Sequence, residues 1–218
     1  MSRWRSDRLD LRIGAHDIAL MRGDARTELA VQAGDWAALA AQLPPLVKPR
    51  ARLAVTLADC WVRYFLLAPP EGVASLRDCR LLLGARFEAL YGHSAADWVL
   101  QADWQAGRPM LACALPRALA QALAPLRLAR VQPDLLSVWN RHCGTLPGTG
   151  ALCASADGLA NLLYWDGAAI RVVRQQRGAD VDALLALELA RIDAEMPAAR
   201  FWAGACAPVG WTRLEAAP

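Results

Sequence analysis

The sequence predicts an α/β protein in which one arrangement of strands and helices occurs twice. Runs typical of strands come in threes and are followed by runs typical of helices, once before and once after residues 146–150. That stretch, Leu-Pro-Gly-Thr-Gly, is the one segment with linker composition, so we expect subdomains over residues 1–145 and 146–218. Hydrophobic residues make up 56% of the 218, which is enough for a large core.

In the first half, alternating apolar residues predict strands and apolar residues at helical spacing predict helices. The expected strands cover residues 9–13, 18–21, 27–31, 52–57, 61–67, 97–102, 109–115 and 128–131. The expected helices cover residues 36–43, 76–90, 116–126 and 134–142.

Capping residues support these helix boundaries. Asp35 and Ser75 are predicted N-caps, because their side-chain oxygens can accept hydrogen bonds from unpaired N–H groups at a helix start. Gly92 stands where a helix C-terminus favours glycine. Two consecutive prolines, Pro44 and Pro45, are expected to end the preceding helix.

The second half repeats the pattern. Strands are expected over residues 151–156, 159–165 and 168–174, with Asp166-Gly167 as a hairpin turn. A helix over residues 180–195, stopped by Pro197, and a strand over residues 200–205 complete the prediction.

Composition and charge exclude several classes of protein. With 24 Lys+Arg against 21 Asp+Glu the net charge is only +3, which does not favour a nucleic-acid binder. The charged residues 1–8 argue against a signal peptide, and no apolar run reaches the roughly 18 residues that a membrane span needs. We therefore expect a cytoplasmic protein that neither binds nucleic acid nor inserts into a membrane.

No motif predicts catalysis, a metal or a cofactor. The six cysteines are scattered without a C-x-x-C pair, and the histidines have no second metal-binding residue at ligand spacing. Neither G-x-S-x-G nor G-x-x-x-x-G-K-[ST] occurs. The expectation is a protein with no catalytic residue, no metal and no cofactor.

The nine tryptophans are the unusual feature of the composition. Most are expected to fill the core, but Trp and Arg also dominate binding hot spots. On a strand over residues 61–67, Trp61 and Arg63 would share one face. That face has two interpretations: a groove for a partner, or burial against a neighbouring helix.

Four local strings resemble the actin-like pilus assembly proteins of the PilM type, and are similar to the cytoplasmic part of the type II secretion protein GspL. They are VTLADCWVRYFLLAPP at residues 55–70, LLGARFEALY at 82–91, LACALP at 111–116 and ARVQP at 129–133. As an order of elements the resemblance covers most of the chain. It implies an actin-like (ribonuclease H-like) fold with a duplicated core whose second half is truncated.

In such folds two hairpins grip nucleotide phosphates, and the resemblance places the first of them at residues 12–17. This sequence has Arg12 where the family has aspartate, and a cation cannot ligate magnesium. The degenerate nucleotide positions that the resemblance implies are Gly14, His16, Asp17, Asp157, Gly158 and Gly204. The resemblance places the second hairpin at residues 154–158, where the acid and the glycine are shifted relative to the family pattern. Residues 203–206 stand where the family has a glycine-rich turn that contacts the adenosine. Nucleotide binding is therefore expected to be lost.

The resemblance then implies a non-enzymatic scaffold of a type IV pilus or type II secretion assembly. It would bind the N-terminal cytoplasmic tail of a single-pass, PilN-like inner-membrane protein and so associate peripherally with that membrane; a homodimer is left open. Two alternatives remain at this point. One is a divergent ATP-binding protein that uses Asp17 and Asp157. The other is an α/β adaptor unrelated to pili.

Overall fold

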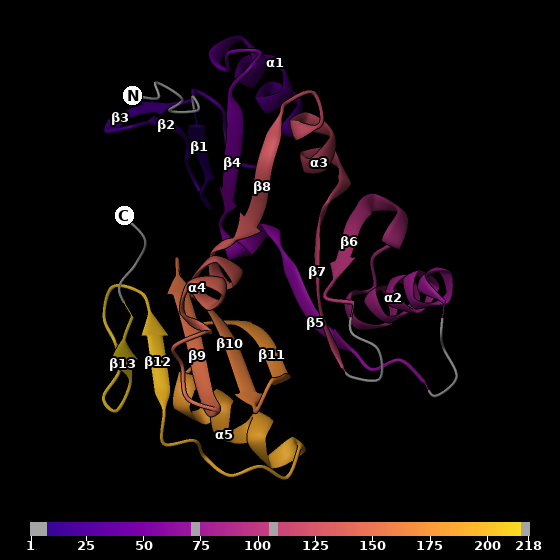
Figure 1. Ribbon diagram of the computed structural model, residues 1–218, viewed down its shortest axis with the longest axis vertical. Coiled ribbons are helices and arrows are strands. Elements are labelled where there is room, and N and C mark those ends of the chain that lie inside the picture. Colours follow the sequence, from indigo (N-terminus) through magenta and orange to yellow (C-terminus); the bar gives the residue numbers. More distant parts are fainter. Residues whose placement is uncertain (1–7, 71–74, 105–108, 215–218) are drawn as a thin grey trace, which may run out of the picture. The chain divides into compact units, whose positions relative to one another are not determined.

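The computed structural model describes residues 8–70, 75–104 and 109–214 (Figure 1). The chain forms two compact units and passes between them several times. Unit 1 holds the described residues up to Val62 together with residues 96–99 and 115–134, and unit 2 holds the rest. The units do not coincide with residues 1–145 and 146–218. The reason is that the first part of the chain contributes a strand that lies beside a strand of the second part, both within unit 2.

Unit 1 is built on a five-stranded mixed sheet. Its order is β3 (Ala25–Glu28), β2 (Ile18–Arg22), β1 (Arg8–Ile13), β4 (Arg52–Leu57) and β8 (Leu128–Pro133). The first three strands form an antiparallel meander, whereas β4 runs parallel to β1 and β8 runs parallel to β4.

Two helices supply the apolar side of this unit. They are α1 (Trp36–Leu46) and α3 (Arg117–Leu123), which pack against each other. Leu39 and Leu43 of α1 and Leu119 of α3 are fully buried, as are the alternate residues Leu11 and Ile13 of β1. Apolar residues at helical spacing on one element and at strand spacing on the other thus meet in one core.

Unit 2 contains a second five-stranded sheet with the same arrangement. Its order is β11 (Ala169–Arg177), β10 (Leu159–Asp166), β9 (Thr149–Ala156), β12 (Arg200–Ala203) and β13 (Thr212–Arg213). An antiparallel meander is again followed by two parallel strands. The predicted α/β fold with a duplicated core is therefore confirmed.

Helix α5 (Val181–Arg191) supplies the apolar partner of this second sheet. Its Leu184, Leu185 and Leu189 belong to one buried cluster with Leu162 of β10 and Trp202 of β12. Burial of these side chains stabilises this part of unit 2 through the hydrophobic effect.

A smaller sheet, most of whose residues belong to unit 2, carries the remaining elements. Its order is β5 (Arg63–Leu67), β7 (Met110–Pro116) and β6 (Trp98–Ala102), and β5 lies beside β11. Helix α2 (Leu76–Tyr91) covers one face, where Phe65 packs against Phe87 and Tyr91 at ring-centroid distances of 6.1 and 6.3 Å. The short 3₁₀ turn η2 (Ala95–Asp97) precedes β6, and α4 (Asp134–His142) follows β8.

The predicted caps are confirmed. The side chain of Asp35 accepts a hydrogen bond from the N–H of Ala38 at 3.0 Å, and that of Ser75 accepts one from Asp78 at 3.1 Å. Gly92 takes the left-handed conformation at φ +66°, as a helix-terminating glycine does. These are interactions between residues close in sequence, which is why they could be predicted.

Several predicted boundaries were wrong. Helix α1 continues through Pro44 and Pro45 to Leu46, because both prolines lie in its last turn, where few bonds remain to be lost. Helix α5 ends at Arg191 rather than at residue 195, because Asp193 adopts φ +53° and the N–H of Ala194 bonds back to the carbonyl of Leu189. Strand β3 begins earlier than predicted, and β12 ends at Ala203.

The strand predicted over residues 61–67 begins only at Arg63. Trp61 lies in a 3₁₀ turn, η1 (Asp59–Trp61), closed by hydrogen bonds from the N–H groups of Trp61 and Val62 to the carbonyls of Ala58 and Asp59. The shared strand face expected for Trp61 and Arg63 is therefore wrong.

Over residues 8–70, 75–104 and 109–214, no helix has both the length and the apolar character that crossing a bilayer requires. All six cysteines lie within these ranges and are free thiols.

Candidate functional site

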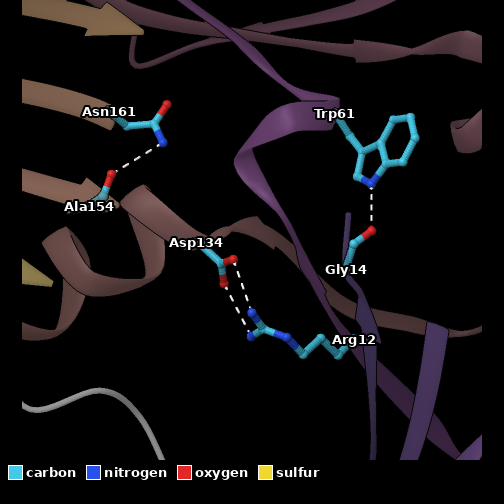
Figure 2. Close-up of polar contacts among 6 residues, drawn as sticks. All are labelled: Arg12, Gly14, Trp61, Asp134, Ala154 and Asn161. Atoms are coloured by element: carbon cyan, nitrogen blue, oxygen red, sulfur yellow. Dashed lines mark hydrogen bonds and ion pairs between the residues drawn. The ribbon is translucent and has the colours of Figure 1, made fainter. Parts of the chain in front are cut away.

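The first predicted nucleotide hairpin is a four-residue loop, Gly14 to Asp17, that joins β1 to β2 in unit 1. The N–H of Gly14 donates to the carbonyl of Asp17 at 2.8 Å. The carbonyl of Gly14 accepts the indole Nε1–H of Trp61, also at 2.8 Å (Figure 2). Both backbone groups of Gly14 are thus used inside the protein, and its N–H is not offered to a ligand.

The side chain of Asp17 folds back over Gly14. Its Oδ1 lies 2.1 Å from the point that a β-carbon on Gly14 would occupy, so a larger residue there would have to displace this carboxylate. Its Oδ2 accepts a hydrogen bond from Arg26 at 2.8 Å, and Arg26 also binds Glu28 at 3.0 Å. A carboxylate therefore lies against the glycine backbone that the resemblance assigns to phosphate, and it carries a charge of the same sign.

Arg12 makes an ion pair that the sequence did not predict. Its two terminal nitrogens each lie 3.4 Å from a carboxylate oxygen of Asp134, the first residue of α4 (Figure 2). A guanidinium at this place neutralises the acid and supplies no oxygen ligand to a cation. His16 is exposed to solvent in the same loop. In the part of the chain that the structure describes, no cluster of three or more His, Cys, Asp or Glu side chains could hold a metal ion.

The second predicted hairpin is a two-residue turn between β9 and β10 in unit 2. Asp157 and Gly158 have φ values of +52° and +71°, and Ala156 pairs directly with Leu159 across the turn. Two consecutive residues at positive φ make the tight turn that Asp-Gly favours. The conformation of this turn is enough to explain why Asp157 and Gly158 occupy these two positions.

Gly204 follows β12 at the end of the sheet where β9 also ends. A β-carbon there would lie 2.8 Å from Nε1 of Trp202 and 2.9 Å from the carbonyl of Ser155, so the close approach of the backbone requires glycine. A pocket of about 320 Å³ at this end is lined by Gly158, Trp202 and the first residues of α5. The pocket thus contains Gly158 and Trp202, which lies two residues before Gly204, but not Gly204 itself.

This pocket is a poor place for phosphate. Asp180 caps α5, and its Oδ1 accepts the N–H groups of Asp182 and Ala183 at 3.0 and 3.2 Å. The helix N-terminus, which binds anions when its N–H groups are free, is therefore occupied by a carboxylate. Asp182, which also lines the pocket, pairs its carboxylate with Arg200 at 2.9 Å.

Trp61 and Arg63, the two residues predicted to bind a partner, belong to different elements, the turn η1 and strand β5, and their partner-binding role stays a prediction. Trp61, in unit 1, is held by its hydrogen bond to Gly14 and by edge-on contact with Trp36 at 4.9 Å. Arg63 is the first residue of β5 and belongs to unit 2. Burial raises the pKa of Tyr91, and the positive charge of Arg63 partly offsets that increase. Trp61 is therefore engaged in fixing the first hairpin.

A groove in unit 2 was not predicted at all. It has a volume of about 380 Å³, and we call it the α4 groove. It is lined by Gln101, Ala102, Asp103, Leu111, Cys113, Leu136, Trp139, Asn140 and Ile170. Leu111 and Cys113 lie on the face of the small sheet opposite to α2, because their neighbour Ala112 pairs with Phe65, which faces α2.

The wall of the α4 groove is apolar and firmly supported. Trp139 packs against Trp165 at 5.1 Å, and Trp165 donates its Nε1–H to the carbonyl of Pro147 at 2.9 Å. Burial raises the pKa of Cys113 to about 11, so its thiol is uncharged at neutral pH. The polar residues Gln101, Asp103 and Asn140 complete the lining. The spacing of Leu136, Trp139 and Asn140 on one side of a helix is the signal that could have indicated it.

No protein-family model and no curated protein sequence matches this chain. Among solved structures, the cytoplasmic domain of EpsL, an inner-membrane component of the type II secretion system of Vibrio cholerae, matches with a TM-score of 0.50 and 16% identity over 78% of this chain and 71% of that one. The PilM–PilN type IV pilus biogenesis complex matches with a TM-score of 0.53 and 16% identity over 88% of this chain and 67% of the other.

A third match is a Bacteroides thetaiotaomicron protein described as having an actin-like ATPase fold and unknown function. Its TM-score is 0.55 at 8% identity, over 89% of this chain and 81% of that one. The actin-like fold of the PilM and GspL kind, expected from the local strings and the order of elements, is therefore confirmed. At these identities the likeness concerns the fold, and fold alone does not carry function.

Proposed function

We propose that this protein is a non-enzymatic scaffold that binds the N-terminal cytoplasmic tail of an inner-membrane protein in a type IV pilus or type II secretion assembly. The fold supports this, since one structural neighbour is an inner-membrane component of a type II secretion system and another forms a complex named PilM–PilN. In this proposal the protein works on the cytoplasmic side of the inner membrane, held there by its partner.

The observation that carries the non-enzymatic part is the chemistry of the first hairpin. The carboxylate of Asp17 lies against Gly14, and the guanidinium of Arg12 pairs with Asp134. A phosphate charge about 4 Å from an unpaired carboxylate is opposed by up to ~4 kcal/mol at an effective dielectric constant of about 20. Arg26 reduces this repulsion by pairing with Asp17, but it also holds the carboxylate in place.

The α4 groove supplies the binding site of the proposal. An extended peptide could place one apolar side chain against Trp139 and Leu111. Within the described residues β6 is an edge strand of its sheet, so the peptide main chain could pair along its outer edge beside Gln101 and Ala102, which line the groove. Main-chain pairing combined with one aromatic anchor is a common way to bind short peptides.

A thermal-shift titration with magnesium and ATP tests the non-enzymatic part. Binding stabilises a protein by RT ln(1 + [L]/Kd), so millimolar ATP should move the Tm by less than about 1 °C if the site is lost. A rise of several degrees would overturn this part and favour the alternative of a divergent ATP-binding protein.

Isothermal titration calorimetry tests the partner. The ligand is a synthetic peptide with the N-terminal cytoplasmic sequence of the single-pass membrane protein encoded beside this gene. We expect binding that Asn140→Arg weakens at least tenfold, because arginine would fill the rim of the α4 groove. Leu187→Arg, at a half-exposed site on α5 outside the groove, is the matched control. Equal binding by both variants would overturn the site, and no binding of the native tail would favour an adaptor unrelated to pili.

A further inference from the structure

A larger cavity in unit 2 shares no lining residue with the α4 groove. It has a volume of about 550 Å³. Its apolar lining comes from Leu66 and Leu67 at the end of β5, from the following Ala68, from Pro109 and from Ile192 after α5. Two arginines, Arg86 and Arg171, complete it. This volume lies within the range of roughly 300 to 1,000 Å³ that is usual for ligand sites.

Arg171 reaches this cavity because of an irregularity in strand β11. Tyr164 of β10 pairs with Val172, and Trp165 pairs with Ile170, so Arg171 is an extra residue without a partner across the sheet. Such a bulge on an edge strand redirects one side chain, and β11 is the edge of its sheet within the described residues. The fold therefore places this guanidinium at the cavity by a specific distortion.

Neither arginine is held in an ion pair within the described ranges, although Asp166, Asp193 and Glu195 line an adjoining pocket together with Arg171. Among the described residues, Arg86 and Arg171 make no hydrogen bond and no ion pair, and the electrostatic contact of Arg171 is with the hydroxyl of Tyr164. Other arginines of unit 2 do have acidic partners: Arg174 and Arg191 bind Glu188, and Arg200 binds Asp182. Two unpaired guanidiniums beside a mostly apolar cavity favour an anion attached to an apolar group.

We propose that this cavity binds the C-terminal carboxylate of a peptide that ends in an apolar residue. The planar fork of arginine matches the two oxygens of a carboxylate, and the apolar lining suits the last side chain. A dianion such as phosphate fits less well than a singly charged carboxylate, because the repulsion from Asp166, Asp193 and Glu195, which line an adjoining cavity with Arg171, grows with the charge of the ligand. This proposal does not depend on the scaffold function, since it uses different residues.

Titrations of the full chain with two small peptides test the proposal. The probes are acetyl-Gly-Gly-Leu with a free carboxylate and the same peptide as its C-terminal amide, followed by NMR signals of the arginine side-chain Nε–H groups. We expect the carboxylate to bind at least tenfold more tightly than the amide. Arg86→Gln and Arg171→Gln should each weaken carboxylate binding at least fivefold. Arg77→Gln, an exposed arginine of α2 outside the cavity, should change it less than twofold.

Several results would overturn the proposal. These are equal affinity for carboxylate and amide, no binding at about 10 mM peptide, and an equal effect of Arg77→Gln and Arg86→Gln. Displacement of the peptide by inorganic phosphate at equal concentration would overturn the choice of a carboxylate. Both substituted residues are exposed, so unchanged melting curves should accompany any loss of binding.

Discussion

Substituting Gly150 by alanine should destabilise unit 2 and disturb the α4 groove. Gly150 lies on β9 directly opposite Trp165 of β10. A β-carbon on Gly150 would lie 2.6 Å from Cζ2 and 2.8 Å from Cη2 of that indole, and 3.0 Å from the carbonyl of Ala199. Atoms cannot approach this closely, so either the indole or the backbone must move.

The indole has little freedom to move. Trp165 is 2% exposed, donates its Nε1–H to Pro147, and packs against Trp139 and Phe201 at 5.1 and 6.3 Å. Adding a methyl group to a filled core usually costs about 1–3 kcal/mol. For a chain of this length each kcal/mol lowers Tm by about 2–4 °C, so a cost of about 2 kcal/mol predicts a fall of about 4–8 °C.

Thermal unfolding followed by tryptophan fluorescence measures this effect. Gly148→Ala is the matched control, because nothing lies within 4 Å of its added β-carbon. We expect that control to remain within about 1 °C of the native protein. Because Trp165 supports Trp139, Gly150→Ala should also weaken binding of the tail peptide. Equal Tm values for the two alanine variants would refute the packing argument.

Three further predictions concern other parts of the chain. At pH 8, iodoacetamide should alkylate the exposed Cys206 rapidly and spare Cys153. Burial raises the pKa of Cys153 to about 12, so its thiol stays protonated; equal alkylation rates measured by mass spectrometry would contradict this. Asp182→Ala should cost about 1–2 kcal/mol in urea unfolding, because it removes the acceptor of the Trp211 indole, and an unchanged midpoint would count against that role. Trp61→Phe should cost about 0.5–1.5 kcal/mol by the same measurement through its lost bond to Gly14, whereas native stability would show that the bond contributes nothing.

The duplicated order of elements could be predicted because each element depends on patterns among residues close in the sequence. Alternation of apolar residues, the capping oxygens of Asp35 and Ser75, and the Asp166-Gly167 turn each depend on residues a few positions apart. Chemical defects in the first hairpin were also visible, since Arg12 cannot ligate a metal in any conformation. The succession of strands and helices along each half follows from this information, whereas the strand order within the two five-stranded sheets comes from the structure.

The partners of those residues could not be predicted. Arg12 pairs with Asp134, which lies 122 positions away, only because parallel pairing of β1, β4 and β8 brings the two together. The α4 groove likewise combines residues from β6, β7, α4 and β11.

The sequence by itself determined which elements form, where most helices begin, and that an arginine, Arg12, precedes Ile-Gly in the first hairpin. Tertiary structure alone decided that Trp61 fixes the first hairpin, that Asp17 covers Gly14, and which apolar residues remain accessible in grooves. The physical reason is that capping and periodicity involve neighbours in the chain, whereas a groove exists only after distant strands have paired in one register.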